Sequence, residues 1–415
     1  MPAVVDAQTS LGPARNRLGR RVAMVTYSRY PADPRPRRAV AALLDEGMLV
    51  DLICLEDEGA SRGKLPRGLN LVCVPIRHRR GGKFAYAYRY SAFILISALV
   101  FALRSLRRRY HLVYVHNMPD VLVLSAVLPK LFGAKVILDL HDPMPELMTT
   151  IFKLAEDSFG VRFMRGLEKW SIARADRVLT VNLACKRIFA SRSCAAEKID
   201  VVMNSPDEQI FPFRPAQSDT SKNGLPSDRF RIMYHGSLVE RNGLDLAVEA
   251  LARVRKNIPF AELRIYGSET PFLKRVMAEV REKHLGQCVH YLGPKSLEDL
   301  VPEIEDCDVG VIPNHRSAFA EINTPTRIFE YLTLGKPVIA PRAAGICDYF
   351  PSGSLVFFEL GNAQDLAARI EYVFFHPPEI REVLQRGQAV YQAHSWSKER
   401  QRLRELVDGL LAANN

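Results

Sequence analysis

Residues 321–340 have the sequence EINTPTRIFEYLTLGKPVIA, which combines helix-terminating residues with charged side chains. Thr324 is a favoured N-cap residue, Pro325 suits the first helical position, and Gly335 followed by Lys-Pro ends a helix. The segment therefore predicts a helix over residues 325–334. The start of a helix has unpaired backbone N–H groups and the positive end of the dipole, so it favours an anion such as phosphate.

Two charged side chains lie on the same face of this predicted helix. Arg327, in the first turn, adds a fixed charge suited to phosphate, and Glu330 follows one turn later. A carboxylate near a diphosphate is repelled unless it accepts hydrogen bonds from a neutral neighbour, such as the ribose hydroxyls of a nucleotide. The alternative is a surface ion pair between the two residues. Glu321, Asn323 and Thr324 precede the helix, where they could reach a sugar beyond the phosphates.

The chain has 415 residues, which favours two domains of ordinary size. Its 47% hydrophobic and 25% charged residues are typical of a soluble globular protein. Short apolar runs alternate with helical patterns, which indicates α/β domains with doubly wound parallel sheets. The predicted units are a tail (1–19), an N-terminal domain (20–208), a linker (209–229), a C-terminal domain (230–390) and a terminal helix that crosses back (391–415).

Several predicted strands end in polar residues or glycine. Ligands of such sheets bind at the carboxyl ends of the strands. Neither G-x-G-x-x-G nor G-x-x-x-x-G-K-[ST] occurs, which argues against ordinary NAD and ATP sites. The resulting candidates are His116, His141, Asp142, Gly236 with Ser237, Gly267 and Asn314.

The sequence predicts no metal site. Asp306-Cys307-Asp308 has a D-x-D pattern, but it lies before a predicted strand, at the end away from a cleft, and we interpret it as a turn. The seven cysteines form no C-x-x-C pair, so neither zinc nor a disulfide framework is indicated. The first twenty residues lack the apolar core of a signal peptide, and we expect a cytoplasmic protein.

The net charge of +11 is concentrated in one region. Residues 59–119 contain twelve Lys or Arg and no Asp or Glu, and they enclose the apolar run 90–103. As a helix this run reaches about 21 Å, less than the roughly 30 Å of a bilayer core, so we expect no span. It is either a buried helix with a solvated basic end or a surface that lies on an anionic membrane, and the two can coexist. Charge alone would also fit nucleic acid, but no nucleic-acid motif accompanies it.

The segment EINTPTRIFEYLTLGKPVIA resembles the donor site of retaining family 4 glycosyltransferases. YSRYPADPRPRRAVAALLDEGMLVDLICL, LFGAKVILDLHDPMPEL, ADRVLTVN, VVMNSPD and YHGSLVERNGLDLAVEAL are similar to other segments of that family, in the same order. The resemblance implies the GT-B fold, two facing Rossmann-like domains with a cleft between them. It also implies transfer of a sugar from a nucleoside diphosphate to a hydroxyl, with retained anomeric configuration and no metal or further cofactor.

The resemblance implies roles for the donor-side residues. Glu330 carries over as a donor contact, whereas Glu321 stands one residue too far from it, with eight residues between. The family's usual Lys before the first helix of the C-terminal domain is replaced by Asn242, with Arg241 as the nearest cation. We infer that Arg241 and Arg327 bind the diphosphate and stabilise the charge that develops on it. Backbone amides near Gly236 and Ser237 add to this, and Lys295 is expected near the base.

On the acceptor side, His141 is the best candidate for a catalytic side chain. Asp142 follows it, His116 ends the neighbouring strand, and Asp33 and Arg35 belong to the segment that resembles the acceptor loop. His235, Trp170 and Trp396 are interpreted as packing residues. Because the basic region suggests a membrane, a lipid-linked acceptor at the inner membrane face is expected, and a soluble saccharide acceptor stays possible.

Two other functions fit parts of the sequence. Nucleotide-sugar epimerases also use facing Rossmann-like domains. A lipid- or nucleic-acid-binding module with a degenerate donor cleft would explain the altered glutamate spacing and the missing lysine. The basic acceptor-side surface argues against an epimerase, and the intact Thr-Pro segment with Arg327 and Glu330 argues against a binding module.

Overall fold

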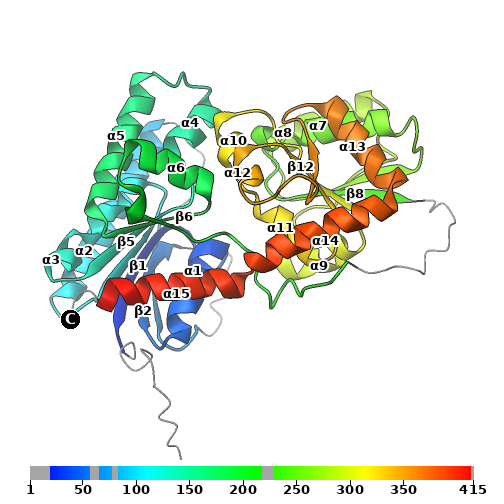
Figure 1. The fold of residues 1–415 in the computed structure, drawn as a ribbon. Helices are drawn as coiled ribbons and strands as arrows, with labels where there is room; N and C mark the ends of the chain where they lie inside the picture. Colours follow the sequence, from blue (N-terminus) through cyan, green and yellow to red (C-terminus); the bar gives the residue numbers. More distant parts are fainter. Residues whose placement is uncertain (1–18, 57–64, 77–82, 217–228, 413–415) are drawn as a thin grey trace, which may run out of the picture.

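The computed structural model describes residues 19–56, 65–76, 83–216 and 229–412. They form two parallel sheets, each covered by helices on both faces and each with its own core (Figure 1). This architecture confirms the predicted α/β class. The carboxyl ends of both sheets border the space between the domains, where a doubly wound fold places its ligands.

The N-terminal sheet has the strand order β3-β2-β1-β4-β5-β6-β7, and all its pairs are parallel. The central strands are buried on both faces, which explains their nearly continuous apolar sequences, whereas the edge strands β3 and β7 are largely half-buried. The strands are β1 (Arg21–Arg29), β2 (Leu49–Leu55), β3 (Leu69–Val74), β4 (Leu112–His116), β5 (Lys135–Leu140), β6 (Arg177–Thr180) and β7 (Ile199–Val201).

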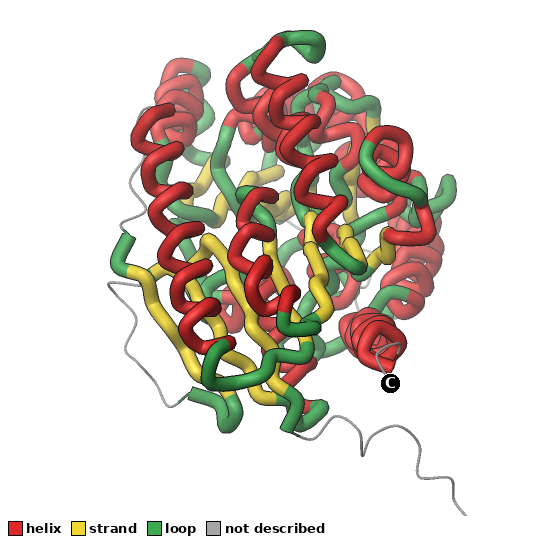
Figure 2. Tube along the Cα trace, turned by 90° about the vertical axis from the view of Figure 1, so that its left-hand side faces the viewer, coloured by secondary structure: helices red, strands yellow, loops and turns green. Residues whose placement is uncertain are grey.

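Helices cover both faces of this sheet, and Figure 2 shows this layering from the side. One face packs against α1 (Pro34–Asp45) and the terminal helix α15 (Trp396–Ala412). The opposite face carries α2 (Lys83–Ser105), η2 (Asp120–Ala126), α3 (Val127–Leu131), α4 (Met144–Phe152), α5 (Phe159–Arg174) and α6 (Leu183–Arg192).

The C-terminal sheet has the order β10-β9-β8-β11-β12-β13, again entirely parallel. Its strands are β8 (Phe230–His235), β9 (Ala261–Tyr266), β10 (Val289–Tyr291), β11 (Val309–Val311), β12 (Val338–Pro341) and β13 (Val356–Phe358). Its helices are α7 (Leu244–Val254), α8 (Pro271–Glu282), α9 (Leu297–Glu305), α10 (Ala318–Ile322), α11 (Thr326–Thr333), α12 (Ala344–Cys347), α13 (Ala363–Phe375) and α14 (Pro377–Ala393). Three-residue turns, η3 (Ala196–Lys198) and η4 (Glu240–Asn242), complete the elements.

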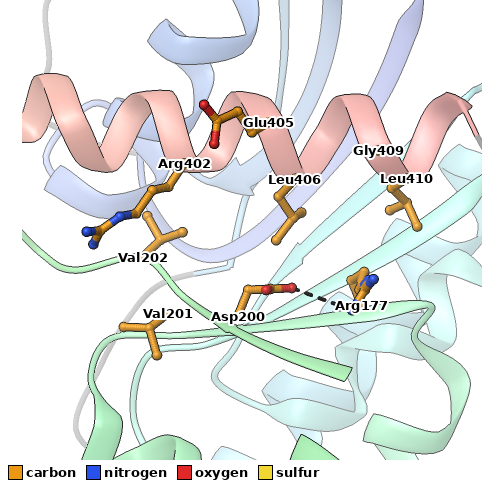
Figure 3. Close-up of a pocket in the computed structure, with 9 residues that line it drawn as sticks. All are labelled: Arg177, Asp200, Val201, Val202, Arg402, Glu405, Leu406, Gly409 and Leu410. Atoms are coloured by element: carbon orange, nitrogen blue, oxygen red, sulfur yellow. Dashed lines mark ion pairs between the residues drawn. The ribbon is translucent and has the colours of Figure 1, made fainter. Parts of the chain in front are cut away.

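The terminal helix α15 connects the two domains. It follows α14 of the C-terminal domain, yet its Leu403, Val407 and Leu411 are buried in the core beneath α1 of the N-terminal domain. Between α15 and the edge strand β7 lies a cavity of about 430 Å³, whose floor holds the Arg177–Asp200 ion pair (Figure 3). This cavity lies beside the chain crossover but contains none of the predicted site residues.

Helix α2 is longer than the apolar run from which it was predicted. Its 23 residues reach about 35 Å, and the window Tyr88–Ser105 is long and apolar enough to cross a membrane by length and composition. The segment was expected to be too short to span a bilayer, and this expectation was wrong because the helix extends beyond the apolar run. Phe93, Ser97 and Phe101 are nevertheless fully buried against the sheet, while only 22% of the window is buried. The helix is thus part of the domain on one face and open on the other.

Candidate active site between the two domains

A cavity of about 340 Å³ lies between the domains, and we refer to it as the interdomain cavity. Its N-terminal wall consists of the start of α1 and the residues after β5. Its C-terminal wall is formed mainly by α11 and the start of α9. The lining residues are Asp33, Pro34, Arg35, Arg37, Arg38, His141 and Asp142, then Asn204, Pro206, Asp207 and Phe211 of the crossover, then Leu297, Thr326 and Glu330.

The predicted charged pair of the C-terminal wall is held by β8. Glu330 Oε2 lies 2.6 Å from Nε2 of His235, and Arg327 Nη1 donates to the backbone oxygen of His235 at 2.7 Å. Within the described ranges, Arg327 and Glu330 form no ion pair with each other, so the surface-pair alternative is wrong. The guanidinium of Arg327 also lies 4.9 Å from the centre of the Tyr234 ring, which fixes its position.

Two glycines allow the backbone to approach closely at this wall. Gly236 has a φ of 119°, and a Cβ there would lie 3.2 Å from Cδ of Arg327. Gly243, with a φ of 67°, starts α7, and a Cβ would stand 1.8 Å from the backbone oxygen of Pro313. A side chain would be strained at either position. The turn between them carries Ser237, which is exposed, and the half-buried Arg241.

The interpretation of Thr324 as the N-cap of α11 was wrong. Pro325 occupies the N-cap position, and the Thr324 hydroxyl instead donates to the backbone oxygen of Gly345 at 2.7 Å. The same hydroxyl accepts a hydrogen bond from Nδ2 of Asn182, which also donates to Ile322. Asn182 caps α6 of the N-terminal domain, so Thr324 links the two domains beside the cleft.

Three other donor-side candidates lie outside the lining of the interdomain cavity. Glu321 is 3.6 Å from Arg316, and Lys295 is 3.1 Å from Glu303. Asn323 is the C-cap of the short helix α10. Their contacts with the sugar or the base stay predictions.

Arg35 of the N-terminal wall binds other residues of the domain interior. Arg35 is buried, donates to both oxygens of Asp139 at 2.6–3.0 Å, and also binds the backbone oxygen of Val202 at the crossover. Burial opposes ionisation of Asp139, yet Arg35 and His116 hold the pKa of its carboxyl well below the ordinary value. The guanidinium of Arg35 is thus occupied in supporting the wall, although the residue borders the cavity.

The acceptor role predicted for His116 was wrong. His116 is fully buried, and its Nδ1 lies 3.4 Å from Oδ2 of Asp139. Because its ring faces this interior carboxylate, it cannot contact an acceptor. His116, Asp139 and His141 bring possible metal ligands within 4.8 Å of one another, but Arg35 and Tyr114 already occupy both oxygens of Asp139. The cluster therefore does not fit a cation.

The predicted turn at Asp306-Cys307-Asp308 has structural partners. Asp306 pairs with Arg231 and Arg264, and Asp308 accepts a hydrogen bond from the backbone N–H of Arg231. All these contacts lie at the amino end of β11, away from the cleft, so the D-x-D pattern is a structural feature here.

His141 and Asp142, which follow β5, are two of the titratable groups that line the N-terminal wall. Burial lowers the pKa of His141 to about 4, so its ring is neutral at pH 7, and its Nδ1 has no partner among the described residues. Burial raises the pKa of Asp142 to about 6, against the opposing effect of Arg241 across the cleft. Asp33, the N-cap of α1, lies beside them.

Asn117 positions this pair, although sequence reasoning did not single it out. Its side chain accepts from the backbone N–H of His141 at 3.1 Å and donates to the backbone oxygen of Asp142 at 2.8 Å. It also donates to the buried Asp120. Its place in VHNMPD, directly after a strand-terminal histidine, was the only sequence feature that could have indicated it.

Two facing doubly wound domains with a cavity between them are the architecture of the GT-B glycosyltransferases. Comparison with protein families agrees. Residues 32–205 match the glycosyl transferase 4-like domain, and residues 216–388 match glycosyl transferases group 1. The chain belongs to the group 1 glycosyltransferases of the family 4 type, which use nucleotide-sugar donors.

The relatives with known names are distant. The chain is 22% identical over 186 residues to glycogen synthase of Mycobacterium tuberculosis, which covers 45% of this chain and 42% of that protein. It is 22% identical over 275 residues to sulfoquinovosyl transferase SQD2 of Arabidopsis thaliana, covering 64% of this chain and 50% of that protein. The chain thus spans half the length or less of the curated relatives it matches.

Solved structures confirm the fold over nearly the whole chain. Sucrose-phosphate synthase from Thermosynechococcus elongatus superposes with a TM-score of 0.76 at 18% identity, covering 95% of this chain and 100% of that one. HepE of Anabaena in complex with UDP-glucose gives 0.65 at 16%, covering 94% and 99%. WaaG, a glycosyltransferase involved in lipopolysaccharide biosynthesis, gives 0.66 at 16%, covering 93% and 99%.

Proposed function

We propose that this glycosyltransferase retains the anomeric configuration, needs no metal, and extends a polysaccharide or glycolipid acceptor at the cytosolic face of a membrane. The observation that carries the donor part is that His235 holds both Arg327 and Glu330, and that Glu330 lines the interdomain cavity together with His141 and Asp142. The bound UDP-glucose of HepE, a structural neighbour, supports a nucleotide-sugar donor here.

In the proposed reaction, departure of the nucleoside diphosphate is the costly step. Arg327 and Arg241 stabilise the negative charge that develops on the leaving phosphate, and the N–H groups at the start of α11 add to this. The bond from Arg327 to His235 fixes this charge before the donor binds, so little reorganisation is needed. Because the ring of His141 is neutral, it can hydrogen-bond sugar or acceptor hydroxyls without adding a charge.

The membrane part of the proposal rests on the open face of α2. Leu95, Leu99 and Leu103 recur every fourth residue and are 68%, 60% and 56% exposed. Leu131 of α3, which packs beside α2, is 75% exposed. An apolar strip of this extent on a soluble domain marks a surface for a membrane or a protein.

Charge favours an anionic membrane over a protein partner for this strip. The strip ends in Arg107, Arg108 and Arg109, and each cation near an anionic leaflet contributes about 1 kcal/mol. On α5, in the same helical layer, the exposed rings of Phe159 and Phe163 stack at 6.3 Å and form a second apolar surface feature. The strip would lie in the membrane interface while the cleft remains open to the cytosol.

The reaction is tested by incubating the protein with UDP-, GDP- and ADP-sugars in EDTA, with bacterial membranes or a soluble saccharide as acceptor. We expect release of one nucleoside diphosphate and an acceptor-linked sugar whose anomeric configuration, read by NMR, equals that of the donor. Inverted product, or turnover that requires a divalent cation, would contradict the proposal. Sugar isomerisation without acceptor would instead indicate an epimerase.

Membrane binding is tested separately by cosedimentation with vesicles of neutral or anionic lipid. We expect binding to anionic vesicles that falls several-fold in the double variant Leu99→Gln/Leu103→Gln. Phe159→Gln serves to test the extension along α5, and Leu292→Gln, an exposed residue of the other domain, is the matched control. Equal binding of the α2 variant and the control would remove the membrane part of the proposal.

A further inference from the structure

His235, at the carboxyl end of β8, contacts both charged residues of the donor wall. Its ring Nε2 lies 2.6 Å from Oε2 of Glu330, and its backbone oxygen accepts from Nη1 of Arg327 at 2.7 Å. His235 is only 4% exposed. A polar ring at such a position is costly unless its nitrogens are paired, and both are paired here.

A contact on the other ring nitrogen, Nδ1, fixes the orientation of the His235 ring. Nδ1 lies 2.8 Å from the hydroxyl of Tyr331, which also reaches the backbone oxygen of Met233 at 2.9 Å. Tyr331 in turn requires the absence of a side chain at Gly310, where a Cβ would lie 2.4 Å from its ring. The contacts form a continuous support from the sheet to Glu330.

Chemistry determines which ring nitrogen carries a proton. An ionised carboxylate only accepts hydrogen bonds, so the proton of the short contact with Glu330 belongs to Nε2 of His235. The Tyr331 hydroxyl has a single proton: when the ring is charged, Nδ1 donates to that hydroxyl, which donates to the backbone oxygen of Met233, and when the ring is neutral, the hydroxyl donates either to Nδ1 or to Met233. The Nε2–H to Glu330 contact persists in both states.

We propose that His235 is a positioning residue for nucleotide recognition, which orients the Glu330 carboxylate so that its second oxygen meets the ribose hydroxyls. This inference rests on the proposed donor role of Glu330. Oε1 of Glu330 has no hydrogen-bond partner in the described part of the chain, and Glu330 lines the interdomain cavity. Without the Nε2 bond, the carboxylate would lose its fixed rotamer and the one hydrogen-bond donor that it has among the described residues.

The test compares nucleotides with and without the ribose diol. Dissociation constants of UDP, GDP and ADP and of their 2′,3′-dideoxy counterparts are measured by calorimetry for the wild type, Glu330→Gln, His235→Asn and His235→Gln. The two histidine variants are matched, because the Gln amide nitrogen reaches the Nε2 position whereas the Asn nitrogen reaches that of Nδ1.

We expect the wild type to prefer the ribonucleotide over its dideoxy form by about tenfold or more, the size of a hydrogen bond to a charged group. Glu330→Gln and His235→Asn should lose this preference while binding the dideoxy form as the wild type does. His235→Gln should keep most of it. A merely structural role would weaken both nucleotides equally in the Asn variant.

Two results would overturn the inference: undiminished ribose preference in His235→Asn, or equal loss in the Asn and Gln variants. If the Asn variant does not fold, Tyr331→Phe replaces it, with an expected several-fold loss of preference, and full preference in that variant overturns the inference as well. If the wild type binds the ribonucleotide and the dideoxynucleotide equally, Glu330 does not bind the ribose. That result would contradict the proposed function and is distinct from the two results that contradict the positioning role of His235.

Discussion

The two walls of the interdomain cavity use similar residues for opposite purposes. On the C-terminal wall, β8 holds Glu330 through the His235 ring and Arg327 through the His235 backbone oxygen and the Tyr234 ring, and we expect their remaining polar atoms to bind the ligand. On the N-terminal wall, Arg35 and His116 surround the interior carboxylate of Asp139. The comparison teaches that a charged side chain beside the cleft is available to a ligand only when no buried group of opposite charge already binds it.

The largest expected effect concerns the N-terminal wall. Arg35→Ala leaves Asp139 buried without its cation, which costs about 3–5 kcal/mol of unfolding free energy. Arg37→Ala is the matched control, since Arg37 borders the same cavity and has no ion pair among the described residues. Denaturant unfolding measures both. Equal stability of the two variants would mean that the Asp139 network does not support the wall.

The C-terminal wall is tested by Arg327→Ala. Loss of one preorganised charge from the leaving phosphate should lower kcat/KM for sugar transfer by about 100- to 1,000-fold, with little change in the melting temperature. Arg253→Ala, an exposed arginine of the same domain paired with Glu249, is the control. Wild-type activity in the Arg327 variant would contradict the claim that this wall, unlike the N-terminal wall, supplies a charge to the ligand.

A buried acid behind the N-terminal wall predicts a pH dependence of stability. Burial raises the pKa of Asp120 to about 7, against the opposing hydrogen bond from Asn117, whereas the unfolded chain titrates near 4. Its stability contribution is full below about pH 4 and is lost as the pH rises through 7. Asp120→Asn should therefore gain about 2–4 kcal/mol at pH 8 and almost nothing at pH 4. An equal effect at both values would exclude the buried-acid explanation.

The smallest effect concerns the contact between the domains. Thr324→Val keeps the shape of the side chain and removes the hydrogen bonds with Gly345 and Asn182, so it should cost about 1 kcal/mol. Thr326→Val, two positions away at the start of α11, loses no side-chain hydrogen bond to a described residue and serves as the control. A loss as large as that of Arg35→Ala would show that the domains depend on this contact.

Sequence patterns predicted the parallel sheets and the donor helix because these depend on local periodicity and on residues a few positions apart. The partner of Glu330 could not be predicted, since His235 lies 95 positions away and meets it only when α11 packs on β8. The burial of His116 was missed for a related reason. At a strand end, the sequence does not show whether the last side chain points into the cleft or toward the interior.

The extent of α2 illustrates a further limit. The apolar run 90–103 predicted the middle of the helix, but the helix begins at Lys83. Its start was missed because hydropathy indicates burial rather than backbone conformation. Thr324 matched a capping preference, yet Pro325 occupies the N-cap position. The hydroxyl of Thr324 instead donates a hydrogen bond to Gly345 in a neighbouring helix. Tertiary contacts override local preferences where two domains meet.

The account is tested most directly by calorimetric titration of UDP, GDP and ADP into the wild type, Arg327→Ala and Glu330→Ala. We predict that at least one nucleoside diphosphate binds the wild type and that each variant binds it at least tenfold more weakly at an unchanged melting temperature. Wild-type affinity in both variants, or no binding of any diphosphate to the folded wild type, would contradict the assignment of this wall as the donor site.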